Sequence, residues 1–148
     1  MGLTQESTEM VTIKKEHLKQ INKHGEKTYN EECCGALLGE VNGEAHNVVE
    51  LIEFYNERGE NRERRYLITP EQYRKSEQTA DDKGLELLGF YHSHPDHPSK
   101  PSQFDTDHAL PWFLYMIVSV QKGKAEKLTS WKLKEDRSEF EEQKINVV

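Results

Sequence analysis

Two histidines separated by one residue follow an apolar segment in the middle of the chain. They are His92 and His94, in the stretch LGFYHSHPDHPSKPSQFD over residues 88–105. Residues i and i+2 of a strand project from the same face, so both imidazoles can point into one space. Imidazole nitrogens bind zinc at about 2.0–2.1 Å. The spacing therefore favours a pair of ligands for one metal ion.

A carboxylate at the end of the same stretch offers a third ligand. Ser102 and Asp105 have the spacing of a helix-capping pair, which would place Asp105 in the first turn of a short helix. Pro95, Pro98 and Pro101 stiffen the loop and reduce the entropy cost of bringing this carboxylate to the histidines. Two imidazoles and one carboxylate leave a fourth position of a zinc ion for water, as in hydrolytic sites rather than structural ones.

A hydrolytic metal site also needs a general base beside the bound water. The chain contains 27 aspartates and glutamates, so spacing alone does not choose among them. Glu32 stands out because it directly precedes the apolar segment 33–41, where a charged side chain is hard to explain as an exposed surface residue. A solvated helix end is the competing interpretation for Glu31 and Glu32, and the residues by themselves leave both open.

The elements that must position these residues are a mixture of helices and strands. One helix is expected over 14–28, and a second over 69–83, where Thr69 and Gln72 form a capping box around Pro70. Asn42-Gly43 is a hairpin turn signal. The expected strands are 33–41, 44–54, 65–68, 85–92, 112–120, 128–133 and 140–148. Helices interspersed with hairpin-linked strands predict an α/β (α+β) fold around a mixed sheet.

Length and composition favour one globular domain. The chain has 148 residues, enough to bury about two thirds of its unfolded surface. A net charge of −7 without a basic cluster argues against a nucleic-acid partner. The apolar run 109–120 is too short for a bilayer, which needs about 20 residues, so no membrane contact is expected. The adjacent Cys33 and Cys34 suit a reducing cytoplasm. Residues 1–10 are expected to be a disordered tail and 11–148 the domain.

Two segments together carry a resemblance to a known family. ECCGALLG (32–39) followed by HSHPDHPSKPSQFD (92–105) resembles the JAMM (MPN-plus, Mov34) zinc metalloproteases, in their small prokaryotic form. Their pattern is an upstream Glu, then His-x-His, seven residues, Ser, two residues and Asp, and every position is present. The implied fold is a deaminase-like three-layer sandwich, with a central mixed β-sheet and flanking helices in a single domain.

The resemblance also implies the roles of the site residues. His92, His94 and Asp105 would hold one zinc ion per chain. Glu32 would be the general acid/base, and the hydroxyl of Ser102 would stabilise the oxyanion while its backbone caps the helix. Cys34 would be part of the core. The aromatic residues Trp112, Phe113 and Tyr115 are likewise interpreted as core rather than as a substrate platform.

The family implies a substrate class as well. Its enzymes hydrolyse a peptide or isopeptide bond after the C-terminal Gly-Gly of a ubiquitin-like or sulfur-carrier protein. Such a flexible tail could add as an extended strand beside an exposed sheet edge. Two other interpretations stay open. One is a catalytically inactive MPN-type interaction scaffold, although inactive members typically lose ligands that this chain keeps. The other is an iron(II) enzyme with two histidines and one carboxylate.

Overall fold

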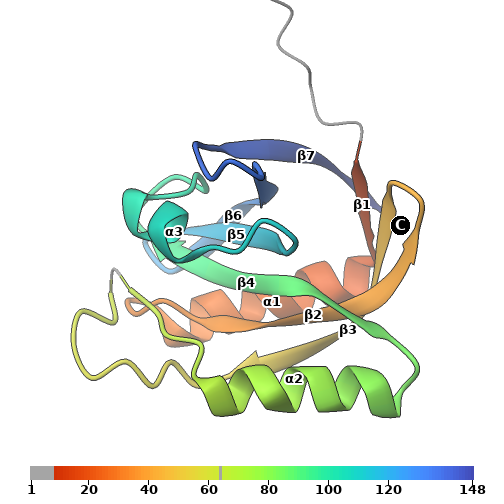
Figure 1. The fold of residues 1–148 in the computed structure, drawn as a ribbon. Helices are drawn as coiled ribbons and strands as arrows, with labels where there is room; N and C mark the ends of the chain where they lie inside the picture. The colour runs from red at the N-terminus through yellow and green to blue at the C-terminus, as the bar shows by residue number, and fades with distance from the viewer. Residues whose placement is uncertain (1–8, 64) are drawn as a thin grey trace, which may run out of the picture.

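The computed structural model describes residues 9–63 and 65–148, which form three helices and seven strands (Figure 1). The helices are α1 (Lys15–Thr28), α2 (Pro70–Asp82) and α3 (Gln103–His108). The strands are β1 (Met10–Ile13), β2 (Cys34–Asn42), β3 (Ala45–Phe54), β4 (Glu86–Pro95), β5 (Leu114–Gln121), β6 (Lys124–Leu133) and β7 (Phe140–Val147). None of the described helices is long and apolar enough to cross a membrane.

The described strands form one mixed sheet in the order β1-β3-β2-β4-β5-β6-β7. β4 and β5 run parallel, whereas β2 is antiparallel to both β3 and β4. The mixed sheet predicted from the sequence is thus confirmed. β1 pairs in parallel with β3 and also with β7, so the sheet curves round and closes. The sequence does not predict this closure, because residues 1–10 are expected to be a tail and no strand is expected over 11–13, whereas β1 spans Met10–Ile13. Residues 1–8 lie outside the described part of the chain.

The helices flank the sheet because its strands bury side chains on both faces. Leu37 and Tyr91 point toward the face that α1 covers with Ile21. Their neighbours along the strands, Ala36 and Phe90, point to the opposite face, where they pack with α2. This alternation is the period of two that strands impose. The result is a layer of helix on each side of the sheet, as the resemblance implied.

The local signals for the helices are confirmed. The side chain of Thr69 accepts a hydrogen bond from the backbone N–H of Gln72, and the Gln72 side chain accepts one from the N–H of Thr69. Pro70 occupies the first helical position. Gly84, at a φ of 66°, follows the end of the helix in the left-handed conformation that glycine adopts readily.

Two expectations from the sequence are wrong. Residues 65–68 form no strand; their backbone runs irregularly, and the N–H of Leu67 bonds to the Asn56 side chain instead of to a neighbouring strand. Trp112 is 66% exposed, whereas Phe113 and Tyr115 are buried as predicted. Both errors have one cause. Apolar residue types mark segments that can pack, but they do not say which side chain of a short segment faces inward.

Gly89 allows β4 and β5 to approach closely beside the segment that carries the histidines. A Cβ atom at this position would lie 1.9 Å from the carbonyl oxygen of Leu114. Gly89→Ala should therefore lower the free energy of unfolding by about 3 kcal/mol, since the backbone must shift. Urea denaturation followed by circular dichroism measures this. Gly59→Ala is the matched control, because a Cβ there meets nothing within 4 Å. Equal losses in both variants would contradict the explanation.

Candidate metal centre

β4 brings His92 and His94 to one point, which α3 approaches with Asp105. The strand continues to Pro95, so both histidines lie within it and share a face, while Ser93 points to the other side and accepts a hydrogen bond from the N–H of Cys33. The Nε2 atoms of the two imidazoles are 3.1 Å apart. The carboxylate oxygens of Asp105 lie 3.4 Å from Nε2 of His92 and 3.2 Å from Nε2 of His94. All three side chains are buried.

These three side chains fit a divalent cation. Ligands of a tetrahedral zinc ion at about 2.0–2.1 Å lie about 3.3–3.4 Å from one another, close to the spacings observed here. Nδ1 of His94 is 2.8 Å from the carbonyl oxygen of Pro98, which can only accept, so this nitrogen carries the proton. The lone pair of Nε2 therefore faces the centre. Such an outer hydrogen bond commonly orients a histidine ligand.

His92 is held differently from His94. Its Nδ1 is buried and has no hydrogen-bond partner among the described residues. The ring of Tyr66 stacks on its imidazole instead, with centroids 4.4 Å apart and planes 21° from parallel. Burial lowers the pKa of His92, although the neighbouring Asp105 acts in the opposite direction. The imidazole is therefore neutral at physiological pH, as a metal ligand must be.

Glu32 supplies a second carboxylate at the same place. It precedes β2, is only 4% exposed, and its ligand atom lies with those of His92 and His94 within 4.8 Å of one another. Burial raises the pKa of Glu32 to about 9, helped by the charge of Asp105 and opposed by Arg65. The contacts of Asp105 with both imidazoles, at 3.2–3.4 Å, favour that residue as the third ligand, with Glu32 beside the cluster.

Asp105 stays ionised in the same surroundings. Its burial acts to raise the pKa of the carboxyl, but the two histidines and a backbone hydrogen bond from Ser102 hold the pKa below its ordinary value. The two carboxyl groups therefore have opposite protonation in the metal-free protein. This separation of pKa values is typical of sites in which one carboxylate binds and the other transfers protons.

Ser102 is the N-cap of α3, and the structure corrects the expectation that only its backbone caps the helix. Its hydroxyl oxygen, and not only its backbone, takes part: the oxygen accepts from the N–H of Asp105 at 3.1 Å. In return the Asp105 carboxylate accepts from the N–H of Ser102 at 2.8 Å. The hydroxyl hydrogen remains available for donation. The same capping box thus fixes the position of a candidate ligand and that of a candidate oxyanion donor.

A buried asparagine that the sequence did not single out holds the segment over the site. The Asn56 side chain donates to the carbonyl oxygens of Glu32 at 3.2 Å and Arg65 at 2.9 Å. Its oxygen accepts from the N–H groups of Arg58 and Leu67. Asn56 thus ties Glu32 to residues 55–68, which carry the Tyr66 ring. In the sequence it is one polar residue of a polar loop, so no local signal distinguishes it.

A cavity of about 360 Å³ opens over the centre; we call it the metal pocket. Its lining includes the predicted residues Glu32, His94 and Ser102, and also the unpredicted Arg65 and Lys100. His97 lines it as well, whereas the Nδ1 atom of His108 contacts the carbonyl oxygen of Phe104 in its own helix. The pocket therefore exposes Glu32, His94 and Ser102 on one wall, whereas neither His92 nor Asp105 lines it.

Comparison with known proteins now identifies the family. Residues 14–134 match the family of prokaryotic homologues of the JAB domain. The chain belongs to this family. It is therefore a JAB-domain protein, and the resemblance to the JAMM and MPN proteins inferred from its motifs is confirmed.

Individual relatives agree with this assignment. The JAB-domain protein is 33% identical over 89 residues to a desampylase of Haloferax volcanii; the match covers 60% of this chain and 62% of that protein, so it spans about three fifths of each. A solution structure of a Salinibacter ruber protein has 43% identity and a TM-score of 0.73, covering 93% of this chain and 91% of that one.

Two more distant structures share the fold alone. A Desulfitobacterium hafniense protein has 24% identity and a TM-score of 0.82, covering 94% and 93% of the two chains. A JAB1/MPN domain protein of Archaeoglobus fulgidus has 18% identity and a TM-score of 0.56, covering 93% and 96%.

Because the pKa of Glu32 is raised, the free energy of unfolding of the metal-free protein should depend on pH. A carboxyl with a pKa of about 9 in the folded state and about 4.5 in the unfolded state binds more protons when folded. The free energy of unfolding should therefore fall as the pH rises from about 4.5 to 9, by on the order of 3 kcal/mol at pH 7. Glu32→Gln should remove this loss.

Urea denaturation of chelator-treated protein tests this prediction at two pH values. The Glu32→Gln variant should be more stable than the original chain at pH 8, and the difference should shrink at pH 4.5. Glu31→Gln is the control, since Glu31 is half-exposed and pairs with Arg62 at 3.3 Å. A pH-independent effect of Glu32→Gln would show that its carboxyl group titrates normally.

Proposed function

We propose that this JAB-domain protein is a zinc-dependent peptidase that cleaves after the C-terminal Gly-Gly of a ubiquitin-like or sulfur-carrier protein. The observation that carries the proposal is the meeting of His92, His94 and Asp105 beside the buried carboxyl group of Glu32. The similarity to a desampylase, a name that denotes removal of a protein modifier, supports both the reaction and the substrate class.

The three ligand residues would hold the metal, as their spacing suits it. Zinc in such a site supplies Lewis acidity, which lowers the pKa of a bound water to about 7 and polarises a carbonyl group. The histidines contribute no charge and Asp105 contributes one negative charge. The ligand set thus leaves the centre positive, which favours the ionised form of the nearby Glu32.

Glu32 would move the protons of the reaction. Its carboxylate takes a proton from the attacking water and returns it to the leaving amine, so the same group acts first as base and then as acid. The hydrogen bonds of its carbonyl oxygen with Asn56 and of its N–H with the carbonyl oxygen of Arg62 keep the residue in place. Ser102 would donate its hydroxyl hydrogen to the oxyanion that forms at the scissile carbonyl.

An extended tail would find an open sheet edge near this centre. Among the described residues, β1 pairs with β3 only at residues 45–47, so residues 48–54 have strand pairing on one side alone. Phe54 at the end of β3 is opposite Cys34 of β2, and Cys34 is opposite His92. The open edge therefore ends in the same cross-strand row as a metal ligand. Backbone hydrogen bonding along such an edge suits a Gly-Gly tail, which has no side chains to recognise.

Metal analysis followed by a cleavage assay tests the proposal. Untagged protein purified without chelator should contain about one zinc per chain. With Gly-Gly-extended carrier proteins encoded in the same genome, intact mass should show products that end at the second glycine. Chelator should abolish cleavage and zinc should restore it. Zinc-loaded protein that leaves every carrier uncut would support the scaffold interpretation, and iron in place of zinc would favour the oxygenase interpretation.

A further inference from the structure

The two proposed histidine ligands are oriented by different kinds of contact. Nδ1 of His94 is 2.8 Å from the carbonyl oxygen of Pro98, whereas Nδ1 of His92 is buried and has no hydrogen-bond partner among the described residues. The ring of Tyr66 lies against the imidazole of His92 instead. We propose that Tyr66 is a positioning residue, which sets the ring plane of His92 for metal binding. The inference rests on the proposed function and goes beyond it, because it assigns a residue outside the motif of the family.

Tyr66 and His92 form a close and nearly parallel stack. Their ring centroids are 4.4 Å apart and their planes are 21° from parallel, which is the close end of the range for aromatic pairs. The lone pair of Nε2 lies in the imidazole plane, so the orientation of this plane decides whether the lone pair points at a metal ion. Rotation out of the plane would drive the edge of the imidazole into the tyrosine ring. Tyr66 thus does for His92 what an outer hydrogen bond does for His94.

The aromatic ring of Tyr66, and not its hydroxyl, makes this contact. The hydroxyl has no hydrogen bond within residues 9–63 and 65–148. Across the sheet, His92 lies opposite Cys34 of β2, whose thiol makes no hydrogen bond to the imidazole. Removing only the hydroxyl of Tyr66 should therefore leave His92 in place, whereas removing the ring should release the imidazole from its plane.

The backbone on both sides of Tyr66 is held by Asn56, which is buried. The Asn56 side chain donates to the carbonyl oxygen of Arg65 at 2.9 Å, and its oxygen accepts from the N–H of Leu67 at 3.2 Å. The same side chain donates to the carbonyl oxygen of Glu32 at 3.2 Å. An asparagine side chain has two N–H donors and one carbonyl oxygen, and all of them are used here. The position of the Tyr66 ring is therefore fixed relative to that of Glu32.

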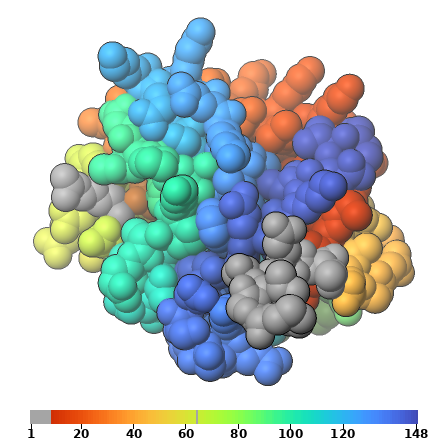
Figure 2. Space-filling model, turned by 90° about the horizontal axis from the view of Figure 1, so that it is seen from above, coloured from red at the N-terminus to blue at the C-terminus, as the bar shows by residue number. Residues whose placement is uncertain are grey.

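The helix α3 holds the same segment from another side. The guanidinium groups of Arg65 and Arg58 lie over the ring of Phe104, 4.6 Å and 5.4 Å from its centroid. Such stacking of a cation on an aromatic face is favourable. Figure 2 shows α3 (teal) between the segment 55–68 (yellow) and the C-terminal strands (blue). The segment that carries Tyr66 is thus held both by Asn56 and by α3.

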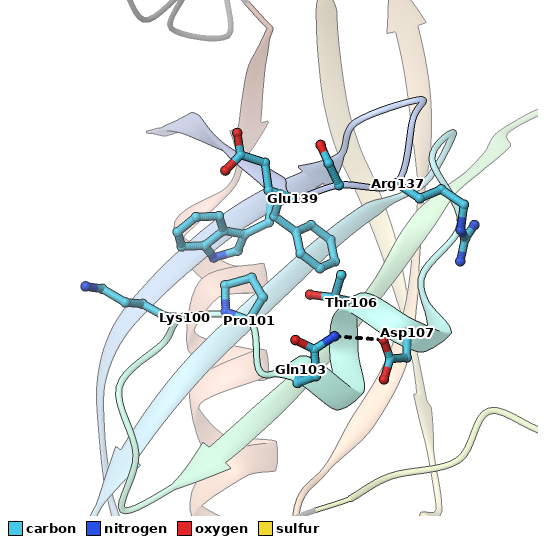
Figure 3. Close-up of a pocket in the computed structure, with 10 residues that line it drawn as sticks. Lys100, Pro101, Gln103, Thr106, Asp107, Arg137 and Glu139 are labelled. Carbon is cyan, nitrogen blue, oxygen red and sulfur yellow. Dashed lines mark hydrogen bonds between the residues drawn. The ribbon is translucent and has the colours of Figure 1, made fainter.

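The two faces of α3 contact different parts of the molecule. Three side chains line a hollow of about 580 Å³ toward the connection from β6 to β7, namely Gln103, Thr106 and Asp107 (Figure 3). Phe104 and Asp105 instead line a cavity of about 280 Å³, which Tyr66 also lines. His92 contacts residues of this second group from two elements, because Asp105 lies 3.4 Å from its Nε2 and Tyr66 stacks on its ring. The carboxylate and the tyrosine ring together therefore determine how the imidazole is oriented.

Zinc titration of three variants tests the role of the ring. Tyr66→Leu should raise the dissociation constant for zinc by about tenfold, since loss of a contact that orients a metal ligand costs about 10- to 100-fold. Tyr66→Phe keeps the ring and should leave the constant unchanged. Tyr73→Leu is the matched control, because Tyr73 lines the same cavity but packs on Phe90 and Phe113 rather than on a histidine. Competition with a chromophoric chelator measures each constant.

Cobalt(II) in place of zinc adds a spectroscopic readout, because its visible absorption bands depend on the arrangement of its ligands. The bands of Tyr66→Leu should shift, and those of Tyr66→Phe and Tyr73→Leu should match the original chain. Circular dichroism verifies that each variant is folded. If Tyr66→Leu does not fold, Tyr66→Met replaces it, since methionine fills irregular space without a ring.

The outcomes separate this inference from the proposed function. A purely structural role of Tyr66 would lower the free energy of unfolding without moving the zinc affinity or the cobalt bands. Unchanged zinc affinity in the folded variant without the ring, or an equal loss of affinity in Tyr66→Phe or Tyr73→Leu, would overturn the inference while leaving the peptidase intact. An original chain that binds no zinc would instead count against the proposed function itself.

Discussion

Glu32→Gln should abolish turnover while the protein keeps about one zinc per chain. Glutamine has nearly the same size and preserves the buried position, but it can neither take a proton from water nor return one to the leaving amine. Loss of a positioned general acid/base should lower kcat by about 10²- to 10⁴-fold. Carrier cleavage by zinc-loaded protein measures the rate, and elemental analysis of the same sample measures the metal.

A neighbouring variant controls for this experiment. Glu31→Gln changes the charge by the same amount one residue away, but Glu31 pairs with Arg62 at the surface and does not face the histidines. Its kcat should stay within about twofold of the original value, because exposed ion pairs contribute little. Full activity in Glu32→Gln would remove Glu32 from the role of general base and would require another proton acceptor in the metal pocket.

The second large effect concerns the metal itself. Asp105→Asn should raise the dissociation constant for zinc by at least about 100-fold, since it removes the negative charge that lies 3.2–3.4 Å from both imidazole nitrogens. Asparagine keeps an oxygen that can accept from the N–H of Ser102, so the start of α3 is preserved. Competition with a chromophoric chelator gives the affinity, and circular dichroism verifies the fold.

Two outcomes of the zinc titration are informative. Asp107→Asn, in the same helix, should leave zinc affinity unchanged, because Asp107 bonds to Gln103 away from the centre. Unchanged affinity in Asp105→Asn, together with a loss of zinc in Glu32→Gln, would exchange the roles of the two carboxylates. The geometry disfavours this exchange, because Asp105 lies 3.2–3.4 Å from both histidine nitrogens and Glu32 is protonated in the metal-free protein.

The positions of the three proposed metal ligands could be predicted from the sequence, because local rules determine them. The period of two along a strand places His92 and His94 on one face, and the structure has them on one face of β4. The capping box places Asp105 at the start of α3, held to Ser102. A capping box also predicted the start of α2. Each of these depends on contacts between residues that are close in the chain, so a single sequence contains the information.

Tertiary structure decided the rest, because those features depend on contacts between distant segments. Glu32 lies near the histidines because β2 pairs with β4. From the residues alone it stood out only by its place before an apolar segment, and a solvated helix end remained an open alternative. Asn56 acts through backbone groups of residues 32 and 65, which no local pattern reveals.

The closure of the sheet by β1 has the same origin. β1 lies near the start of the described chain, and its partners β3 and β7 lie far from it in the sequence. Which distant segments pair depends on how the whole core packs, whereas periodicity and capping depend on only a few neighbouring residues.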